Sequence, residues 1–514
     1  MSAAREERRK QSSTSGRQRT SAACDACRDR KVKCVFRPNE TVCCTCQQLD
    51  IDCTRVKPRG KRGPKNRYVQ ALRSQTRSST PAQDLATTSI SPCSFEMNAP
   101  EDSHELTLEL IAPMPILQQI ISDWFGWIHP VAPIFQHDQI MDQIRRSAMN
   151  NSDSSFIILV SSICAATIAS LRRRRGLYGT VTVEHCLDLA ERLGLWSRKN
   201  PITLEGALAM YNFSSATHHE HGFDSPCAHR FSAGASIGVK YLIYHELEKM
   251  SFINQQILKR LYWLLFAGQC TSDMHGRPLL MLHHAHEQIN SLIPLEVYDE
   301  EVSISDRTDT SSCGQVRRAP SYVPGLNALS RVFLIWQSSQ ATATQTMANL
   351  QEHIKRAQQA LERLPPELTW KGHPSSPMGG ETHHSPASEI GDFGTDVQIV
   401  NIKVTQLHVR SNLLEQMNTL AKTQNLLITP SIIVEERHRV VDELLEVLDA
   451  MPDEVFDANG YSIIPKIRDI GSALLDEVRT GNQGGNLQAG LNLDRLLKKL
   501  ESLDVRPLGQ DSYW

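Results

Sequence analysis

Hydrophobic residues recur every three to four positions along most of the chain from about residue 105 to residue 510. Leu and Ala are abundant in this region, and runs in which β-branched residues alternate with polar ones are few. A helix places residues three to four apart on one face, whereas a strand requires a spacing of two. The sequence therefore predicts a large all-α domain over residues 105–510.

Two segments show what kind of helices we expect in this domain. Residues 154–171 contain no charged side chain, and their five serines and one threonine favour a buried core helix over a membrane span. Arg172 to Arg175 follow, and we expect them to be a solvated or anion-binding helix end, with a nuclear-import signal as the alternative. Apolar residues from Met347 to Leu364 repeat at intervals of three and four, which predicts a core helix ending at Pro365; a dimer helix is the alternative.

Other segments lack a regular hydrophobic pattern. The helix expected within residues 57–77 has barely two turns, which is too short to establish a coiled coil, so homodimer formation stays open. Composition predicts a disordered basic N-terminus over 1–19, a basic linker with that short helix over 57–77, a disordered Ser/Thr/Pro-rich linker over 78–104, and a disordered loop near 373–396.

Six cysteines near the N-terminus follow the spacing C-x2-C-x6-C-x8-C-x2-C-x6-C. Cysteine thiolates at such spacings bind structural zinc, and two tetrahedral ions require eight thiolate bonds, which six cysteines supply only if two of them bridge both ions. A disulfide framework is disfavoured because the charged N-terminus lacks the apolar segment of a secretion signal. The sequence therefore predicts a small zinc-stapled two-helix cluster domain over residues 20–56, with two Zn²⁺ ions per chain bound by Cys24, Cys27, Cys34, Cys43, Cys46 and Cys53. We interpret the seventh cysteine, Cys44, as a free thiol.

Charge is divided unequally along the chain. Residues 1–80 contain 20 of the 55 Lys+Arg and 7 of the 57 Asp+Glu, which leaves 35 and 50 in the other 434 residues. The six residues after Cys27 have a net charge of +3, and the six after Cys46 have −2, so only the first half of the cluster suits a phosphate backbone. We expect Lys31 to reach base edges. Phosphate contacts are expected from the neighbouring Arg28, Arg30 and Lys33, and from Arg59, Lys61, Arg62 and Lys65 in the basic arm that follows.

The segment A-C-D-A-C-R-D-R-K-V-K-C, which contains the first three of these cysteines, resembles the signature of the fungal-type binuclear zinc cluster transcription factors. In that family the first and fourth cysteines bridge the ions, which implies bridging by Cys24 and Cys43, and the lysine that corresponds to Lys31 reads a CGG triplet. Three segments of the predicted helical domain resemble the family's regulatory domain, the middle homology region. They are Trp124 to Phe135, Cys186 to Leu195 and Leu361 to Leu368, and the resemblance covers about residues 105–450.

These features predict a nuclear, sequence-specific regulator of RNA polymerase II genes that binds CGG-containing double-stranded DNA, and we expect an activator. By the resemblance, the regulated genes belong to a catabolic pathway or to a secondary-metabolite cluster. Acidic patches at residues 299–301 and 449–457 are candidate contacts with the transcription machinery. The alternative is a zinc-dependent module that binds protein or RNA without reading a DNA sequence.

Two groups of histidines resemble metal or catalytic sites only superficially. His218, His219 and His221 are expected in a loop, and His283, His284 and His286 on a helix. Neither group accompanies a nucleophile elbow, a metalloprotease motif or a phosphate-binding loop, and we interpret both as ordinary polar residues. The sequence predicts neither an enzyme nor a membrane protein.

Overall fold

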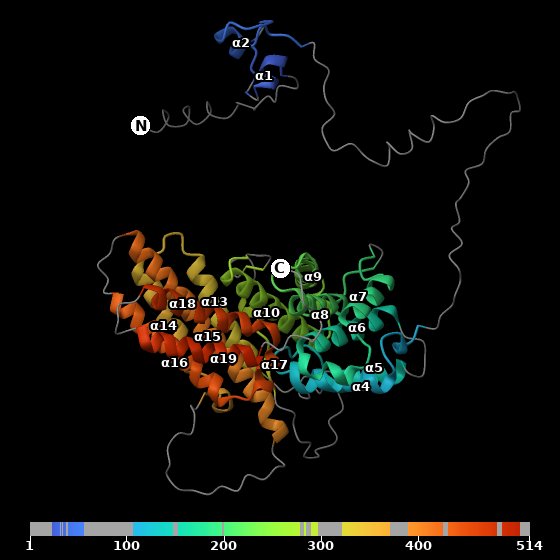
Figure 1. Ribbon diagram of the computed structural model, residues 1–514. Helices are drawn as coiled ribbons and strands as arrows, with labels where there is room; N and C mark the ends of the chain where they lie inside the picture. Colours follow the sequence, from blue (N-terminus) through green and yellow to red (C-terminus); the bar gives the residue numbers. More distant parts are fainter. Residues whose placement is uncertain are drawn as a thin grey trace, which may run out of the picture. The chain divides into compact units, whose positions relative to one another are not determined.

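The computed structural model describes most of the chain as two compact units, Met1–Glu101 and Asp102–Trp514. The residues described are 23–30, 32, 34–37, 40–55, 106–147, 153–197, 200–277, 282–283, 289–296, 321–370, 389–424, 430–480 and 486–503. Those residues form helices, turns and loops and include no strand (Figure 1). The helical character predicted for the larger unit is therefore confirmed. The segments predicted at 1–19, 57–77 and 78–104 lie outside the described residues.

The described residues of the smaller unit include two short helices, α1 (Asp25–Asp29) and α2 (Cys44–Gln48). Each helix begins directly after a cysteine of the predicted cluster. The two helices contact each other, and the buried side chains around which they pack are almost all cysteines. A core this small has little apolar area to bury, so a chain of this length needs another source of stability, such as a metal.

The larger unit, which we call the helical body, is mostly helical over its described residues. Its first half contains η2 (Leu108–Leu110), α4 (Met114–Asp123), the π-helical turn η3 (Trp124–Ile128), α5 (His137–Ser147), α6 (Ser154–Ser170), η4 (Arg172–Tyr178), α7 (Val183–Arg192), α8 (Leu204–His221), α9 (Pro226–His245), η5 (Leu247–Lys249), α10 (Phe252–Met274) and α11 (Ile289–Leu292). Its second half contains α13 (Val323–Gln340), α14 (Met347–Gln359), η6 (Pro366–Leu368), α15 (Glu389–Thr423), α16 (Pro430–Ala450), α17 (Asp453–Asn459), η7 (Gly460–Ser462), α18 (Ile464–Thr480) and α19 (Asn486–Leu503).

Helix boundaries in the body follow side-chain chemistry. The hydroxyl groups at five N-caps accept a hydrogen bond from a backbone N–H in the first turn, which satisfies a donor that has no partner within the helix. These caps are Thr182, Thr203, Ser225, Ser251 and Thr346. Helix α8 ends at Gly222, whose φ of 76° is a conformation that glycine adopts without strain.

Two helices organise the core of the body. Helix α6 is buried on all sides from Ile157 to Ser170 and packs against α7 and α8, which confirms the buried helix expected at this position. Helix α15 packs against α13, α14, α16, α17 and α18. In Figure 1 the helices from α4 to α9 (cyan to green) lie towards one end of the body and those from α13 to α19 (yellow to red) towards the other, with α10 between them.

The structure also corrects two expectations about the body. Helix α15 begins at Glu389, so the last eight residues of the loop expected at 373–396 are helical. The ring of Phe393 packs on that of Trp127 at 4.7 Å between centroids, a tertiary contact that favours helix despite two nearby glycines. Helix α14 ends at Gln359, before the predicted stop at Pro365, while Leu350, Ile354 and Ala357 are buried as expected of a core helix.

In the described part of the chain, no helix combines the length and the hydrophobicity that a membrane crossing requires.

Candidate metal centre and nucleic-acid interface

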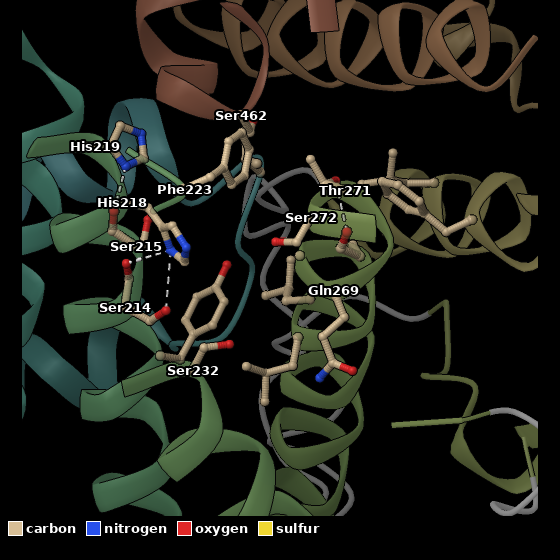
Figure 2. A pocket seen from close by; sticks show the side chains of 18 of the residues that line it. Ser214, Ser215, His218, His219, Phe223, Ser232, Gln269, Thr271, Ser272 and Ser462 are labelled. Carbon is tan, nitrogen blue, oxygen red and sulfur yellow. Dashed lines mark hydrogen bonds between the residues drawn. The ribbon is translucent and has the colours of Figure 1, made fainter. Parts of the chain in front are cut away.

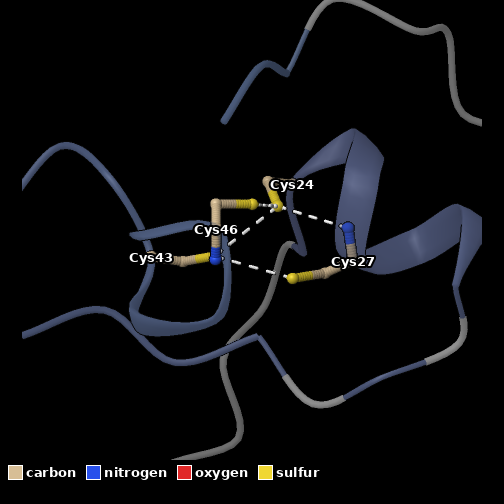
Figure 3. Close-up of side chains that lie close together, drawn as sticks. All are labelled: Cys24, Cys27, Cys43 and Cys46. Atoms are coloured by element: carbon tan, nitrogen blue, oxygen red, sulfur yellow. Dashed lines mark hydrogen bonds between the residues drawn. The ribbon is translucent and has the colours of Figure 1, made fainter. Parts of the chain in front are cut away.

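Four cysteine sulfurs converge between α1 and α2 (Figure 3). The Sγ atoms of Cys24, Cys27, Cys43 and Cys46 all lie within 4.8 Å of one another. The Sγ atoms of Cys24 and Cys46 lie 3.5 Å apart, as do those of Cys27 and Cys43, and the Sγ atoms of Cys24 and Cys43 lie 3.8 Å apart. Sulfurs on one tetrahedral zinc ion with bonds of about 2.3 Å lie about 3.8 Å apart. The spacing therefore suits shared metal ligands.

The sulfurs of the other two cysteines of the predicted set contact the backbone of this group. The Sγ of Cys34 accepts a hydrogen bond from the backbone N–H of Cys24 at 3.4 Å, and the Sγ of Cys53 accepts one from Cys43 at 3.4 Å. Cys34 is buried and Cys53 is half-buried. The structure thus gathers four of the sulfurs into one group and brings the sulfurs of Cys34 and Cys53 to the backbone of Cys24 and Cys43.

The two halves of the site repeat with a shift of 19 residues, the separation of Cys24 and Cys43. Three hydrogen bonds of the first half have a counterpart in the second. The bond from Cys27 N–H to Cys24 Sγ corresponds to the bond from Cys46 N–H to Cys43 Sγ. The bond from Cys24 N–H to Cys34 Sγ corresponds to the bond from Cys43 N–H to Cys53 Sγ. The bond from Asp25 N–H to Thr54 O corresponds to the bond from Cys44 N–H to Val35 O. The last pair crosses between the halves, so the two halves brace each other around the sulfurs.

Burial and hydrogen bonding act differently on the thiols. Burial acts to raise the pKa of Cys43, but hydrogen bonds from the Cys46 amide and from neighbouring thiols outweigh it and lower the pKa to about 6. The pKa of Cys24 is lowered in the same way, against burial, with the amide of Cys27 as the main donor. Burial raises the pKa of Cys27 to about 12 and also raises that of Cys46. The backbone therefore favours the metal-binding thiolate form at the two central cysteines.

Cys44 lies at the start of α2 and does not belong to the group of four close sulfurs. Its backbone N–H bonds to Val35 O at 2.9 Å, and its side chain is half-buried. Its interpretation as a cysteine without a metal stays a prediction.

The structure describes only part of the predicted DNA-binding residues. Arg28 is in α1, and Arg30 follows that helix with an exposed side chain. The other six, Lys31, Lys33, Arg59, Lys61, Arg62 and Lys65, lie outside the described residues. A contact that the sequence did not reveal joins Arg55 to Phe36, with the guanidinium group 4.4 Å from the ring centroid. Cation–aromatic contacts of this kind have no spacing signal in a sequence.

The corresponding surface of the second half is exposed but acidic. Residues 47–50 and Asp52 are exposed, and Ile51 is half-buried. Asp50 has a left-handed backbone conformation with φ of 48°, which allows the N–H of Ile51 to reach Cys46 O at 3.1 Å. The two halves thus share a hydrogen-bond pattern, while their sequences differ in charge.

The four arginines after α6 do not form the solvated or anion-binding end that we expected. Arg174 pairs with Asp123 of α4 at 2.8 Å, and Arg173 pairs with Asp457 of α17 at 3.1 Å. Arg172 donates to the carbonyl of His219, and Arg175 pairs with Glu220 in α8. Three of the four arginines therefore pair with carboxylates of the same body and the fourth binds a backbone carbonyl, so the run joins η4 to α4, α8 and α17.

One of the two acidic patches is likewise engaged within the body. Asp449 pairs with Arg495 at 2.5 Å, and Asp453 pairs with Lys499 at 2.6 Å. Arg173 lies against both Asp453 and Asp457. These carboxylates hold α16 and α17 to α19 and η4, which leaves less free charge for a partner than the sequence suggests. The patch at 299–301 lies outside the described residues.

The histidine groups also differ from expectation. His218, His219 and His221 form the last turn of α8, not a loop, because the helix continues until Gly222. His283 is outside any helix, and His284 and His286 lie outside the described residues.

A further group consists of His275 at the C-cap of α10, His408 of α15 and Asp469 of α18. The side-chain atoms that could bind a metal lie within 4.8 Å of one another. His408 Nε2 lies 2.6 Å from Asp469 Oδ2, and burial lowers the pKa of His408 to about 4 even though Asp469 opposes the shift. We interpret the contact as a hydrogen bond from a neutral His408 to the Asp469 carboxylate, whose pKa is lowered by this bond against burial, and this bond joins α15 to α18. Residues so far apart in sequence give no spacing pattern that could reveal the group.

Comparison with known proteins gives matches over the cysteine segment. The N-terminal region is 39% identical over 54 residues to the glucose transport transcription regulator of Lachancea thermotolerans, and 43% identical over 51 residues to the maltose fermentation regulatory protein of Saccharomyces cerevisiae. Each match covers 10% of this chain, and the matches span 6% and 10% of the two relatives. No family model matches the chain, and no solved structure matches it. The similarity of the N-terminal segment to fungal transcription regulators is thus confirmed, together with the clustering of four of its cysteines.

Proposed function

We propose that the chain is a zinc-dependent transcription regulator that binds double-stranded DNA through its N-terminal cysteine cluster. The observation behind the proposal is the pair of half-sites around the sulfurs, which share their hydrogen bonds but differ in charge. A module that only stored metal or bridged proteins would gain nothing from one strongly basic half, whereas a module that approaches phosphates does. The two matched regulators support the same class of function.

In this proposal two zinc ions are held by Cys24, Cys27, Cys34, Cys43, Cys46 and Cys53. The close approach of the Cys24 and Cys43 sulfurs to the opposite half, at 3.5 Å to Cys46 and to Cys27, supports their assignment as bridging ligands. A closed set of thiolates leaves no open position, so the metal serves to fold the module and takes part in no reaction. The amide N–H groups that point at the sulfurs stabilise their negative charge and fix their positions.

The proposed DNA contacts lie in the basic half and in the arm after the cluster. Lys31 reads a guanine edge within a CGG triplet, as the resemblance implies, and Arg28, Arg30, Lys33, Arg59, Lys61, Arg62 and Lys65 contact phosphates. We further propose a nuclear location, an activating role, and a target set in a catabolic pathway or a secondary-metabolite cluster. A homodimer would add a second CGG half-site.

A gel-shift experiment with the zinc-loaded full chain tests this function. The wild-type protein should bind a CGG-containing duplex more tightly than the same duplex with the triplet scrambled. Lys31→Ala should weaken CGG binding by about 1–3 kcal/mol and bring it close to the scrambled duplex.

A matched control lies at the position related to Lys31 by the 19-residue shift. Asp50→Asn keeps a side chain that tolerates the left-handed backbone there and should leave sequence preference unchanged. Equal binding of both duplexes by the wild type and by both variants would instead indicate a zinc-dependent module that binds protein or RNA.

A further inference from the structure

A cavity of about 170 Å³ lies among α8, α9, α10, α13, α15 and α18 in the helical body. Figure 2 shows Ser214, Ser215 and His218 on one wall, with Thr271 and Ser272 of α10 facing them across the space. Leu264 and Phe333 provide part of the apolar lining. Such a mixture of apolar surface with a few convergent polar groups is typical of small-molecule sites.

Lys466 of α18 is the cation that lines this cavity. Its residue is only 2% exposed, and its ammonium group donates one hydrogen bond, to Thr405 Oγ1 at 2.9 Å. Within the described part of the chain no carboxylate pairs with it, and the ring of Phe333 lies 5.6 Å away. An ammonium group has three donors, and a buried one without a counter-ion is costly. Burial accordingly lowers the pKa of Lys466 to about 7.

Polar groups on the other walls also retain hydrogen-bonding capacity. His218 Nδ1 donates to Ser214 O at 2.9 Å, which leaves Nε2 as an acceptor, and burial lowers the pKa of this histidine to about 4, so it is neutral. The hydroxyls of Ser215, Ser232 and Ser272 have no partner among the described residues. The cavity therefore combines one uncompensated cation with neutral hydrogen-bonding groups.

We propose that this cavity binds a small organic carboxylate, whose carboxylate group pairs with Lys466 and whose carbon skeleton lies against Leu264 and Phe333. An apolar cavity of about 150 Å³ accommodates benzene, so the occupant has about six to ten non-hydrogen atoms. A phosphate or sulfate fits less well, because such ions favour several charged donors and Lys466 is the one Lys or Arg side chain among the described residues that line the cavity. The inference does not depend on the proposed DNA binding.

Thermal unfolding of the zinc-loaded full chain, with probes matched in size, tests the inference. Benzoate and hexanoate are compared with benzamide and hexanamide, each amide having the same number of non-hydrogen atoms as its acid but no charge. At a pH about one unit below the Lys466 pKa of about 7, where the free group is mostly charged, at least one carboxylate should raise Tm by several degrees more than its amide. If neither does so, the proposal is overturned.

Two variants locate the binding. Lys466→Met should fold, because an apolar side chain of similar length replaces an unpaired buried cation, and it should lose the difference between carboxylate and amide. Ser232→Leu fills the cavity from α9 and should abolish the response to both probes even if Lys466→Met fails to fold. The exposed Lys498, paired with Asp494, provides the matched control, and Lys498→Met should respond like the wild type. A carboxylate-specific response that survives either cavity variant would place the ligand elsewhere and refute the site.

Discussion

Replacing Arg174 with Met is expected to destabilise the helical body far more than loss of a surface ion pair. The Asp123 carboxylate is nearly buried and accepts hydrogen bonds from Arg174 Nε at 3.0 Å and Nη2 at 2.8 Å. It also accepts from Tyr178 at 2.8 Å and from Gln119 at 3.1 Å. In Arg174→Met the carboxylate keeps only the two neutral donors and loses its counter-ion.

The size of the effect follows from this geometry. Removing one partner of a buried ion pair costs about 3–5 kcal/mol. The Arg174 side chain is 30% exposed, so water replaces part of the lost interaction, and we take the low end, about 3 kcal/mol. Unfolding entropy is about 2 cal/mol/K per residue, or roughly 0.9 kcal/mol/K for a body of about 400 residues, which converts the loss into a Tm decrease of about 3 °C.

Differential scanning calorimetry of three variants checks the reasoning. Arg145 pairs with Asp142 at 2.6 Å, but both side chains are at least half exposed, so Arg145→Met should cost under about 0.5 kcal/mol. Asp123→Asn in the Arg174→Met background removes the unpaired charge while keeping an acceptor for Tyr178, and it should recover more than half of the loss. The reasoning is refuted if Arg174→Met lowers Tm no more than Arg145→Met, or if the second substitution recovers nothing.

Three further outcomes are expected. Cys24→Ser and Cys43→Ser should each lower the zinc content measured by elemental analysis, whereas Cys44→Ser should leave it at the wild-type value; zinc loss in the last variant would contradict the ligand assignment. DNA affinity should fall steeply between low and physiological salt, since several phosphate contacts are proposed, and a flat salt dependence would argue against the basic arm. The folded-state pKa of Lys466, about 7, lies below its ordinary 10.5, so burying this group destabilises the fold increasingly as pH falls from 10.5 towards 7 and no further below. The Tm of Lys466→Met should therefore exceed that of the wild type most at neutral pH and only slightly at strongly alkaline pH. His408 stays neutral over this pH range, so it does not contribute to the change. A difference in Tm that does not vary with pH would show that the ammonium charge is not the cause.

The features that the sequence predicted correctly depend on local spacing. Consecutive apolar residues from Ile157 to Ala169 required burial on every side, and α6 is buried accordingly. The cysteine spacing predicted one compact centre, and four of the sulfurs lie within 4.8 Å. Both results follow because the residues concerned are close in sequence, so the geometry of one helix or one loop fixes their relative positions.

Features that depend on distant pairing were not predictable in the same way. The charge of the run from Arg172 to Arg175 suggested solvent or an anion, because its carboxylate partners are far away in sequence, as with Asp453 and Asp457. The cavity is a similar case, since Lys466 meets Ser214 and Ser272 only after α8, α10 and α18 have packed. A lysine in a sequence is expected at the surface, and nothing beside Lys466 indicates that this one is buried.

The 19-residue repeat of the cysteine site accounts for how one scaffold can have two different surfaces. Equivalent amide N–H groups donate to the sulfurs of Cys24 and Cys43. The backbone N–H of Asp25 in the first half donates to Thr54 O just after the second half, and that of Cys44 in the second half donates to Val35 O just after the first. Because the backbone and the sulfurs satisfy the structural requirements of both halves, the residues between the second and third cysteine of each half are free to differ. Phosphate approach requires positive charge in one such segment only, and the acidic second segment would repel a duplex that docked in the opposite orientation. In the proposed function, the difference between the +3 and −2 segments would select the face of the cluster that meets DNA, while the hydrogen bonds to the sulfurs remain equivalent in the two halves.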